Sequence, residues 1–352
     1  MTRLTAAALV LFVAVADLAA AQAQEGRADT VRFDGPVTLD RTPATPSQTP
    51  VPPVDRPPIR RRGSMVGYID DAVVGSKLRV RFETGTENDA PDRAEFFYAK
   101  CGCYQGLPPS HPFHDPEAPG PGPGAASELD FQQAFVQGEM ATSDRVSFFA
   151  ELPLRWIQPQ TFVPGTGDPF DSQGGIGDLR GGMKVALVSA LDQVVTLQIR
   201  AFVPTGKAEN GLGTNHLSVE PALLLYHQLS DRASIESQVG LWAPVGGSEG
   251  VPIAASERFS GNVFFYGIGP AVEVYRGPRV RFAPVVELVG WRVLGGFQSI
   301  GEEAAGINIV NLKLGARVSW DDSGSIYGGW GRALTEEQWY HDIVRFEFRR
   351  SF

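Results

Sequence analysis

The sequence predicts an all-β fold, an antiparallel transmembrane β-barrel of about twelve strands. Apolar and polar residues alternate along many segments from Lys77 onward, and the connections between these segments are short and long in turn. The last segment also alternates and ends in an aromatic residue, Phe352. Together these features are typical of the barrels of bacterial outer membranes.

Composition excludes two other classes of protein. Of the 352 residues, 43% are apolar and 20% are charged, and the mean hydropathy is −0.10. This hydropathy is too low for a bundle of membrane-spanning helices. The formal charge of −9 comes without the basic run that nucleic acids attract. We therefore expect no nucleic-acid partner.

The N-terminus has the features of a secretory signal peptide, which we assign to residues 1–23. Arg3 gives a positive start, residues 6–16 form an apolar core, and Ala21-Gln22-Ala23 is a cleavage site of small residues. An N-terminal membrane anchor is the alternative, but the apolar run is short for a span of about 20 residues. The chain is therefore expected to be exported.

Residues 24–75 are assigned to a Pro-rich periplasmic linker. From Gln24 to about Arg62 the chain is polar and has many prolines but few large apolar residues. Such a stretch cannot bury a core, so we expect it to be disordered. The run Arg60-Arg61-Arg62 is interpreted as a solvated charge run. No segment stands out as a plug like that of the long-chain fatty-acid channels.

The alternation has a period of two, which is the period of a strand with one apolar and one polar face. In residues 310–320 the even positions are apolar or small, and the odd positions include Lys313 and Arg317. Residues 146–156 and 177–187 follow the same template. Twelve segments fit it, starting near Lys77, Leu129, Val146, Gly177, Val194, Leu217, Ser234, Gly261, Val280, Ile309, Ser325 and Tyr340. Their length suits tilted membrane-spanning strands of about 9–11 residues with extensions, so we assign residues 76–352 to the barrel.

The connections supply a second regularity. Short gaps such as 141–143 and 190–192 alternate with long ones, of which residues 85–128 form the longest. Outer-membrane barrels have short periplasmic turns and longer outer loops. With twelve strands both ends of the barrel domain lie in the periplasm, and every long gap, including 85–128, is extracellular.

Aromatic residues lie near the predicted strand ends. Trp156, Trp291, Trp330 and Trp339 are near outer ends, and Trp320 is near a periplasmic end, as expected for the two aromatic girdles of a membrane barrel. A soluble β-sandwich or barrel is the alternative, but it accounts only for the alternation. We therefore expect an integral protein of the Gram-negative outer membrane, in contact with its lipid.

The last strand resembles the C-terminal assembly signal of such barrels, in which alternate residues are apolar and the final one is aromatic. Phe346, Phe348 and Phe352 fit this pattern, whereas Arg350 departs from it. The resemblance implies that the barrel-assembly machinery is a partner.

The polar strand faces are expected to line the lumen. They carry both charge signs, and burying such charges unpaired would be costly, so we expect acidic–basic pairs that bridge neighbouring strands. The predicted lumen residues are Arg79, Arg81, Glu83, Glu151, Arg155, Asp178, Arg180, Lys184, Arg200, Glu220, Glu236, Glu273, Arg281, Glu287, Lys313, Arg317, Arg345 and Glu347. A barrel of about twelve strands is intermediate between filled and open barrels. Either a narrow channel for small molecules or a sealed structural or surface-display barrel fits this size.

Two motifs resemble a known family. Gly175-Ile-Gly-Asp-Leu179, followed by Gly182-Met-Lys-Val185, and Arg200-Ala-Phe-Val-Pro-Thr-Gly206 look like neighbouring strands of the outer-membrane family often called MetA-pathway phenol-degradation proteins. Residues 78–82 and 92–98 are also similar to N-terminal portions of some relatives. The resemblance spans about residues 77–352 and implies passive uptake of small hydrophobic or aromatic molecules. The same motifs also have a structural interpretation, in which glycines make turns and Asp178 and Lys184 join the charge pairs.

Proline is difficult to place in this assignment. Pro153, Pro221, Pro270 and Pro284 lie inside predicted strands, and proline cannot donate a ladder hydrogen bond. Because a closed barrel has no edge strand, we expect each to lie at a bulge or beyond the lipid zone.

Other site chemistry is weakly indicated. Cys101 and Cys103, with His111 and His114 nearby, could hold zinc, but the Pro/Gly-rich flanks and the oxidising compartment favour a local or intermolecular disulfide. We assign no metal and no cofactor. A hydrolase is a less favoured alternative: His216, His341 and Ser218 fall near outer strand ends, but there is no Gly-x-Ser-x-Gly motif. We therefore expect no enzymatic activity.

Overall fold

The computed structural model describes residues 63–91, 97–111, 114–246, 260–298, 302–321 and 323–352. The expected signal peptide (1–23) and the expected linker as far as residue 62 lie outside the described residues. No helix in the described ranges is long and apolar enough to cross a bilayer.

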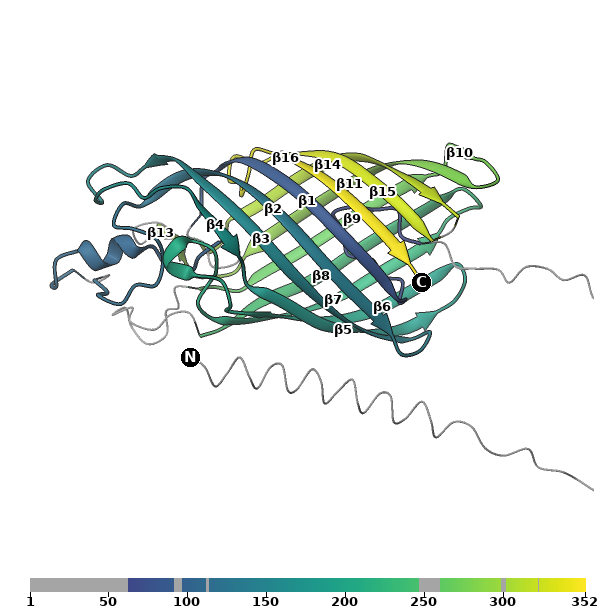
Figure 1. Ribbon diagram of the computed structural model, residues 1–352, viewed down its shortest axis with the longest axis horizontal. Coiled ribbons are helices and arrows are strands. Elements are labelled where there is room, and N and C mark those ends of the chain that lie inside the picture. The colour runs from purple at the N-terminus through teal and green to yellow at the C-terminus, as the bar shows by residue number, and fades with distance from the viewer. Residues whose placement is uncertain (1–62, 92–96, 112–113, 247–259, 299–301, 322) are drawn as a thin grey trace, which may run out of the picture. The chain divides into compact units, whose positions relative to one another are not determined.

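Twelve antiparallel strands form a closed barrel (Figure 1). Two of them are each split in two, β4 with β5 and β9 with β10. The strands are β1 (Lys77–Asn88), β2 (Ala126–Ala141), β3 (Val146–Phe162), β4 (Gln173–Ile176), β5 (Leu179–Ser189), β6 (Gln193–Val203), β7 (Leu217–Gln228), β8 (Ala233–Val245), β9 (Val263–Val272), β10 (Tyr275–Arg276), β11 (Val280–Val293), β14 (Asn308–Trp320), β15 (Gly324–Ala333) and β16 (Asp342–Ser351). Each begins within four residues of its predicted start, which confirms the predicted fold.

Smaller elements lie in the long connections. These are the 3-10 helices η1 (Gly102–Gly106) and η2 (Ala208–Asn210) and a two-stranded sheet formed by β12 (Phe297–Gln298) and β13 (Glu302–Glu303).

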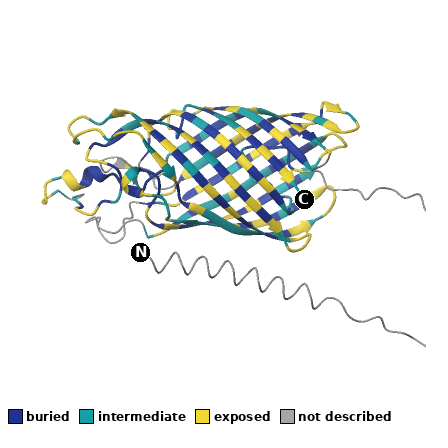
Figure 2. Cartoon of the chain, in the orientation of Figure 1, coloured by how far each residue is buried: buried dark blue, intermediate teal, exposed yellow. Residues whose placement is uncertain are grey.

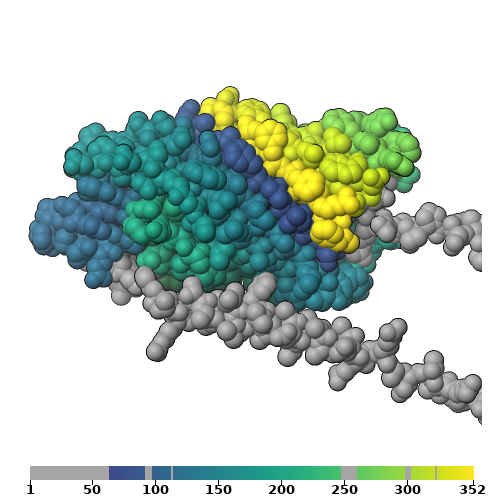
Figure 3. Space-filling model, in the orientation of Figure 1, coloured from purple at the N-terminus to yellow at the C-terminus, as the bar shows by residue number. Residues whose placement is uncertain are grey.

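The barrel closes between its first and last strands. β1 pairs with β16 over ten positions, from Lys77 opposite Ser351 to Thr86 opposite Asp342. Figure 3 shows the yellow C-terminal strand lying directly against the purple β1 on the molecular surface. This pairing leaves no sheet edge to be satisfied within lipid.

The loops differ strongly between the two ends. At one end, successive strands are joined by turns of three or four residues, for example 142–145 and 190–192. At the other end lie all the long connections, of which residues 89–125 form the longest. Lys77 and Ser351 both lie at the short-turn end, which faces the periplasm in outer-membrane barrels. The predicted loop asymmetry is confirmed.

Side chains alternate between the inside and the outside of the wall, as Figure 2 shows in its checkerboard of buried and exposed residues. On β14, Lys313 and Arg317 are buried within the barrel, whereas Leu314 and Val318 are 44% and 38% exposed on its outer surface. An apolar exterior around a charged interior is the reverse of a soluble protein. The chain is therefore an integral outer-membrane β-barrel.

The prolines lie where one of the two neighbouring ladders is interrupted. Beside Pro153, for example, the pairing of β3 passes from β5 to β4, with a gap between Glu151–Arg180 and Leu154–Ile176. The same holds for Pro221, Pro270 and Pro284. A gap in the ladder removes the need for the missing N–H donor.

The expected linker needs correction at its end. Residues 63–76, here called the plug segment, lie inside the barrel rather than outside it: Val66 and Ala72 have no exposed surface. The segment bends at Gly67–Ile69 and leads into β1 at Lys77. Apart from Asp70 and Asp71, its residues are apolar or small and pack inside the barrel. The lumen therefore contains a plug, and the linker does not extend to residue 75.

Two tryptophans also lie elsewhere than expected. Trp156 and Trp330 are exposed on the outer surface, at 42% and 38%. Trp291 and Trp339, however, face inward and lie with ring centroids 4.6 Å apart. Trp291 has the same strand parity as Glu287, which fixes it on the lumen side.

Candidate functional site in the barrel lumen

Glu287 on β11 binds the bend of the plug segment. One carboxylate oxygen accepts the backbone N–H groups of Tyr68 and Ile69 at 2.8 and 2.9 Å. The other accepts the N–H of Gly67 and the hydroxyl of Tyr327, both at 3.1 Å. A buried carboxylate with four donors is well satisfied, so this contact fixes the position of the bend.

Other inward charges hold the two arms of the plug segment. Arg317 donates to the carbonyls of Met65 and Val66 at 2.9 and 2.6 Å. Glu236 accepts the N–H of Met65 at 2.8 Å, and Lys184 donates to the carbonyl of Asp71 at 2.9 Å. The plug segment is thus bound through its backbone by side chains of several strands, among them β5, β8, β11 and β14.

The acidic residues of the plug segment bind basic residues of the wall. Asp70 pairs with Arg200 at 2.6 Å, and Asp71 pairs with Lys77 at 2.6 Å and with Arg349 at 3.3 Å. Burial alone would raise the pKa of Asp71, but these two cations outweigh it and hold that pKa well below its usual range. The Asp71 carboxylate is therefore charged when the plug segment is bound.

Apolar packing completes the binding of the plug segment. Val66 and Ile69 contact the inner face of β9, where Gly267 and Gly269 leave room for them. Each fully buried side chain of this size contributes about 1.5–3 kcal/mol. Small apolar residues on the inner face of β9 would be unusual if they were in contact with water. The plug segment covers them.

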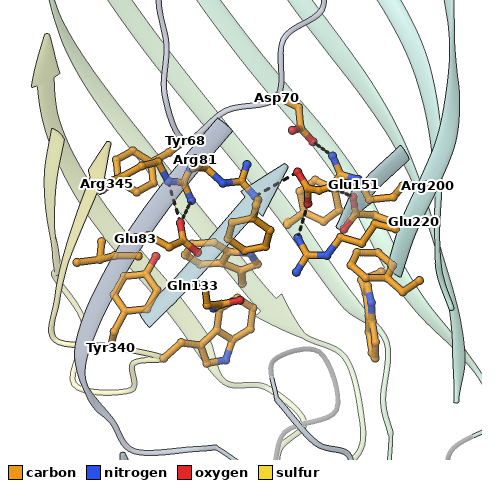
Figure 4. A pocket seen from close by; sticks show the side chains of 18 of the residues that line it. Tyr68, Asp70, Arg81, Glu83, Gln133, Glu151, Arg200, Glu220, Tyr340 and Arg345 are labelled. Carbon is orange, nitrogen blue, oxygen red and sulfur yellow. Dashed lines mark hydrogen bonds and ion pairs between the residues drawn. The ribbon is translucent and has the colours of Figure 1, made fainter. Parts of the chain in front are cut away.

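A chamber of about 220 Å³ lies on the long-loop side of the bend. Its floor includes Tyr68 and Asp70, and Figure 4 shows these residues among the charged side chains of the wall. The charged residues around it are Arg81, Glu83, Glu151, Arg155, Arg180, Arg200, Glu220 and Arg345. All eight are predicted lumen residues, whereas Tyr68, Asp70 and Gln133 were missed.

Most of these charges are paired across strands. Arg345 binds Glu83 at 2.9 Å and stacks over Tyr68, with its guanidinium carbon 4.0 Å from the ring centroid. Arg200 binds both Glu220, at 2.7 Å, and Asp70. The expected bridging of strands by ion pairs is therefore present, although one partner often comes from the plug segment.

Other predicted lumen residues face the interior of the barrel outside the chamber. Glu347 binds Arg79, Arg317 and Arg349 together. Glu273 binds Arg281 at 3.7 Å. Lys313 has no carboxylate partner among the described residues; its ammonium lies 4.6 Å from the ring centroid of Tyr68 and donates to the Tyr340 hydroxyl at 2.8 Å.

Asp178 has a different position from the one expected. Its carboxylate accepts the N–H of Gly206 at 3.0 Å and the N–H of Thr214 at 2.8 Å, so it holds the β6–β7 loop instead of joining an ion pair. Thr205 adds a hydrogen bond from Leu179 N–H at 2.9 Å. The two motifs that carry the family resemblance therefore dock on each other, which supports their structural interpretation.

The longest outer loop contributes an apolar cluster at the outer mouth. Phe97, Tyr98 and Tyr104 are buried there with Trp339 and Ile343. This cluster borders the chamber, which Trp339 and Ile343 also line. The mouth is therefore narrowed by apolar loop residues, while the periplasmic half is filled by the plug segment.

Within the described residues, no disulfide joins Cys101 to Cys103. Both cysteines are buried. The sulfur of Cys101 accepts the backbone N–H of Cys103 at 3.1 Å and thereby caps η1. The local disulfide is absent because the Cys101 sulfur, at the N-cap of η1, is directed at the backbone; the intermolecular disulfide stays a prediction.

The candidate hydrolase residues do not form a catalytic pair. The Ser218 hydroxyl is buried and has no hydrogen-bond partner among the described residues, and the His216 ring contacts the carbonyl of Thr214 at 2.8 Å through Nδ1. His341 contacts Asp342 at 3.0 Å. A nucleophile and a base joined by a hydrogen bond are therefore not found at Ser218.

Fold and lumen together define an outer-membrane β-barrel with an inserted N-terminal plug segment. No family model matches the sequence, and no curated protein matches it. Among solved structures, the chain is similar to a COG4313 outer membrane channel from Pseudomonas putida F1, with 14% identity, 82% of this chain and 99% of that chain covered, and a TM-score of 0.47.

Two further structures are similar over comparable lengths. The β-domain of the Bordetella autotransporter Brka has 12% identity and a TM-score of 0.45, covering 79% of this chain and 100% of that one. The KdgM porin has 8% identity and a TM-score of 0.38, covering 78% and 99%. Because all these TM-scores are low, the description of the fold rests on the strand pairing of this chain.

Proposed function

We propose that this protein is a passive outer-membrane channel for small molecules that is closed at rest by the plug segment. The observation that carries the proposal is the seating of residues 63–76 in a charged lumen, directly beside a chamber of about 220 Å³. A barrel that served only as a scaffold would need neither a chamber nor a separate segment seated beside it. The sealed structural barrel is the second candidate, favoured by the filling of the lumen.

The solute class follows from the resemblance and the chamber walls together. The motifs 175–179 and 200–206 support membership of the MetA-pathway phenol-degradation family, which implies a hydrophobic or aromatic solute. Trp242, Trp291 and Trp339 line the chamber and suit such a ring. We propose no enzymatic activity, and an assay of lipid hydrolysis by purified protein and by a His216→Ala variant tests this.

Conductance separates the channel from the sealed barrel. A variant lacking residues 64–75 is reconstituted into planar bilayers beside the full chain, with a variant lacking residues 30–41 as a control of equal length. We expect the first deletion to raise single-channel conductance severalfold and the control deletion to leave it unchanged. A deletion variant that folds, as shown by heat-modifiable gel migration, but conducts no ions would establish the sealed barrel.

We also propose that the barrel-assembly machinery recognises the last strand. Phe346, Phe348 and Phe352 are 57%, 38% and 84% exposed on the outer surface, where a partner can reach them. Removing Phe352 is expected to lower the fraction of heat-modifiable protein in isolated outer membranes several-fold. Removing the exposed Leu334 instead is expected to have little effect, and equal losses in both variants would contradict the proposal.

A further inference from the structure

The basic residues of one wall of the chamber outnumber its acidic residues. Arg81 and Arg180 share a single carboxylate, Glu151, at 3.5 and 3.1 Å. Arg155 donates to the side chain of Gln133 at 3.1 Å and has no ion pair among the described residues. Arg81 on β1, Arg155 on β3 and Arg180 on β5 are therefore three guanidinium groups whose one ion-pair partner among the described residues is Glu151.

The other charges of the chamber do not offset this excess. Arg345 is bound to Glu83, and Arg200 is shared between Asp70 and Glu220 (Figure 4). These carboxylates are therefore already engaged with other cations.

Several donors of the three guanidinium groups are unused. The Nε of Arg81, the Nε of Arg180 and the Nη1 of Arg155 are buried without a hydrogen-bond partner in the part of the chain that the structure describes. Leaving buried charged donors unpaired is costly. An anion in the chamber would relieve this cost, because a carboxylate accepts two parallel guanidinium hydrogen bonds.

Aromatic rings flank the same guanidinium groups. The Phe135 ring lies between Arg81 and Arg180, whose guanidinium carbons are 4.1 and 5.0 Å from its centroid. Trp291 and Trp339 line the chamber as well. Its volume of about 220 Å³ exceeds the roughly 150 Å³ cavity that accepts benzene in another protein. The chamber therefore has room for one ring.

We propose that Arg81, Arg155 and Arg180 form a binding site for a small organic acid, a carboxylate attached to a single aromatic ring. The proposal rests on the channel proposed above, because the acid is the solute that the channel passes. Arg155 is the decisive residue, since of these three guanidinium groups it is the one that forms no ion pair with a described residue.

Calorimetric titration with benzoate and with its neutral isostere benzamide tests the site. The full chain and the variant lacking residues 64–75 are both titrated in detergent, so that access to the chamber does not limit binding. We expect benzoate to bind at least about tenfold more tightly than benzamide. Arg155→Gln should weaken benzoate binding about tenfold or more, whereas Arg155→Lys should retain part of it.

Arg332→Gln is the matched control, because Arg332 forms an exposed ion pair with Asp342 away from the chamber. It should leave benzoate binding unchanged. The proposal is overturned if both chains bind benzoate and benzamide equally or not at all, if Arg155→Gln binds benzoate like the parent, or if inorganic phosphate binds as tightly as benzoate.

The result is separable from that of the channel experiment. If the variant lacking residues 64–75 conducts ions but binds benzoate and benzamide equally, the proposed acid site is refuted and the proposed channel stands. If benzoate binding depends on Arg155 but the barrel never conducts, the proposed acid site stands and the proposed channel is refuted.

Discussion

At the scale of single residues, the inward charges have two kinds of partner. Some bind charges on the neighbouring strand, as Arg180 binds Glu151. Others bind backbone groups of the plug segment, as Glu287 and Arg317 do. Strand parity predicts that these side chains face inward, because it depends only on the local sequence. It cannot name a backbone partner, since peptide groups leave no signature in the sequence.

Glu287→Gln is expected to loosen the plug segment. A carboxamide has one oxygen, so it cannot accept the hydrogen bonds that reach both oxygens of Glu287, and its NH₂ group would face a backbone N–H. The loss of about 1–3 kcal/mol of binding should raise the open probability about five- to a hundredfold. Single-channel recording measures it, with Asp342→Asn as the control, because the Asp342 carboxylate binds Arg332 and not the plug segment; an unchanged open probability would contradict the assigned anchor.

Gly67→Ala tests the fit of the bend without removing any charge. A Cβ at this position would overlap with the ring of Tyr327, which is itself fully buried. Either the ring or the plug segment must shift, and we expect the open probability to rise. Gly63→Ala is the matched control, because a Cβ there meets no atom within 4 Å. Equal behaviour of the two variants would show that the bend is not tightly packed.

At the scale of elements, the strands could be predicted and the plug segment could not. The period of two marks every strand, and each predicted start was correct within four residues. The plug segment has no such period, and its apolar run is too short to distinguish it in sequence from the Pro-rich linker. A signal was available on β9, whose inner face carries Gly267, Gly269 and Ala271 instead of charges. A lumen face without polar groups indicates that something apolar covers it.

The contact between residues 175–179 and residues 200–206 predicts that Asp178 holds the β6–β7 loop in place. Asp178→Ala removes the acceptor of the Gly206 and Thr214 N–H groups, so the β6–β7 loop should detach while the strands remain paired. Trypsin should then cleave after Lys207, which is exposed, several times faster than in the parent protein. Asp171→Ala, in the preceding outer loop, serves as the control. Cleavage at the parent rate would show that Asp178 does not hold this loop.

At the scale of the whole molecule, the distribution of side chains places lipid outside and charge inside. The ring pair Trp291 and Trp339 shows where sequence reasoning about the girdle was too coarse. Position near a strand end predicts the depth of a tryptophan in the membrane, whereas strand parity decides which side of the wall that tryptophan occupies. Applied to β11, parity puts Trp291 on the same face as Glu287 and assigns it to the chamber.

The orientation of the wall can be tested with a charge placed on the outer face. Leu314 lies midway along β14 and is 44% exposed on the apolar surface. A basic residue near the bilayer midplane costs roughly 2–4 kcal/mol and near the interface only about 0–1 kcal/mol. Leu314→Arg should therefore lower the free energy of unfolding in lipid vesicles by about 2–4 kcal/mol, measured by denaturant titration. Leu334→Arg, in the outer loop that follows β15, should change it by no more than about 1 kcal/mol. If both substitutions cost the same small amount, the exposed apolar face does not contact hydrocarbon, and the barrel would have to be soluble despite its charged interior.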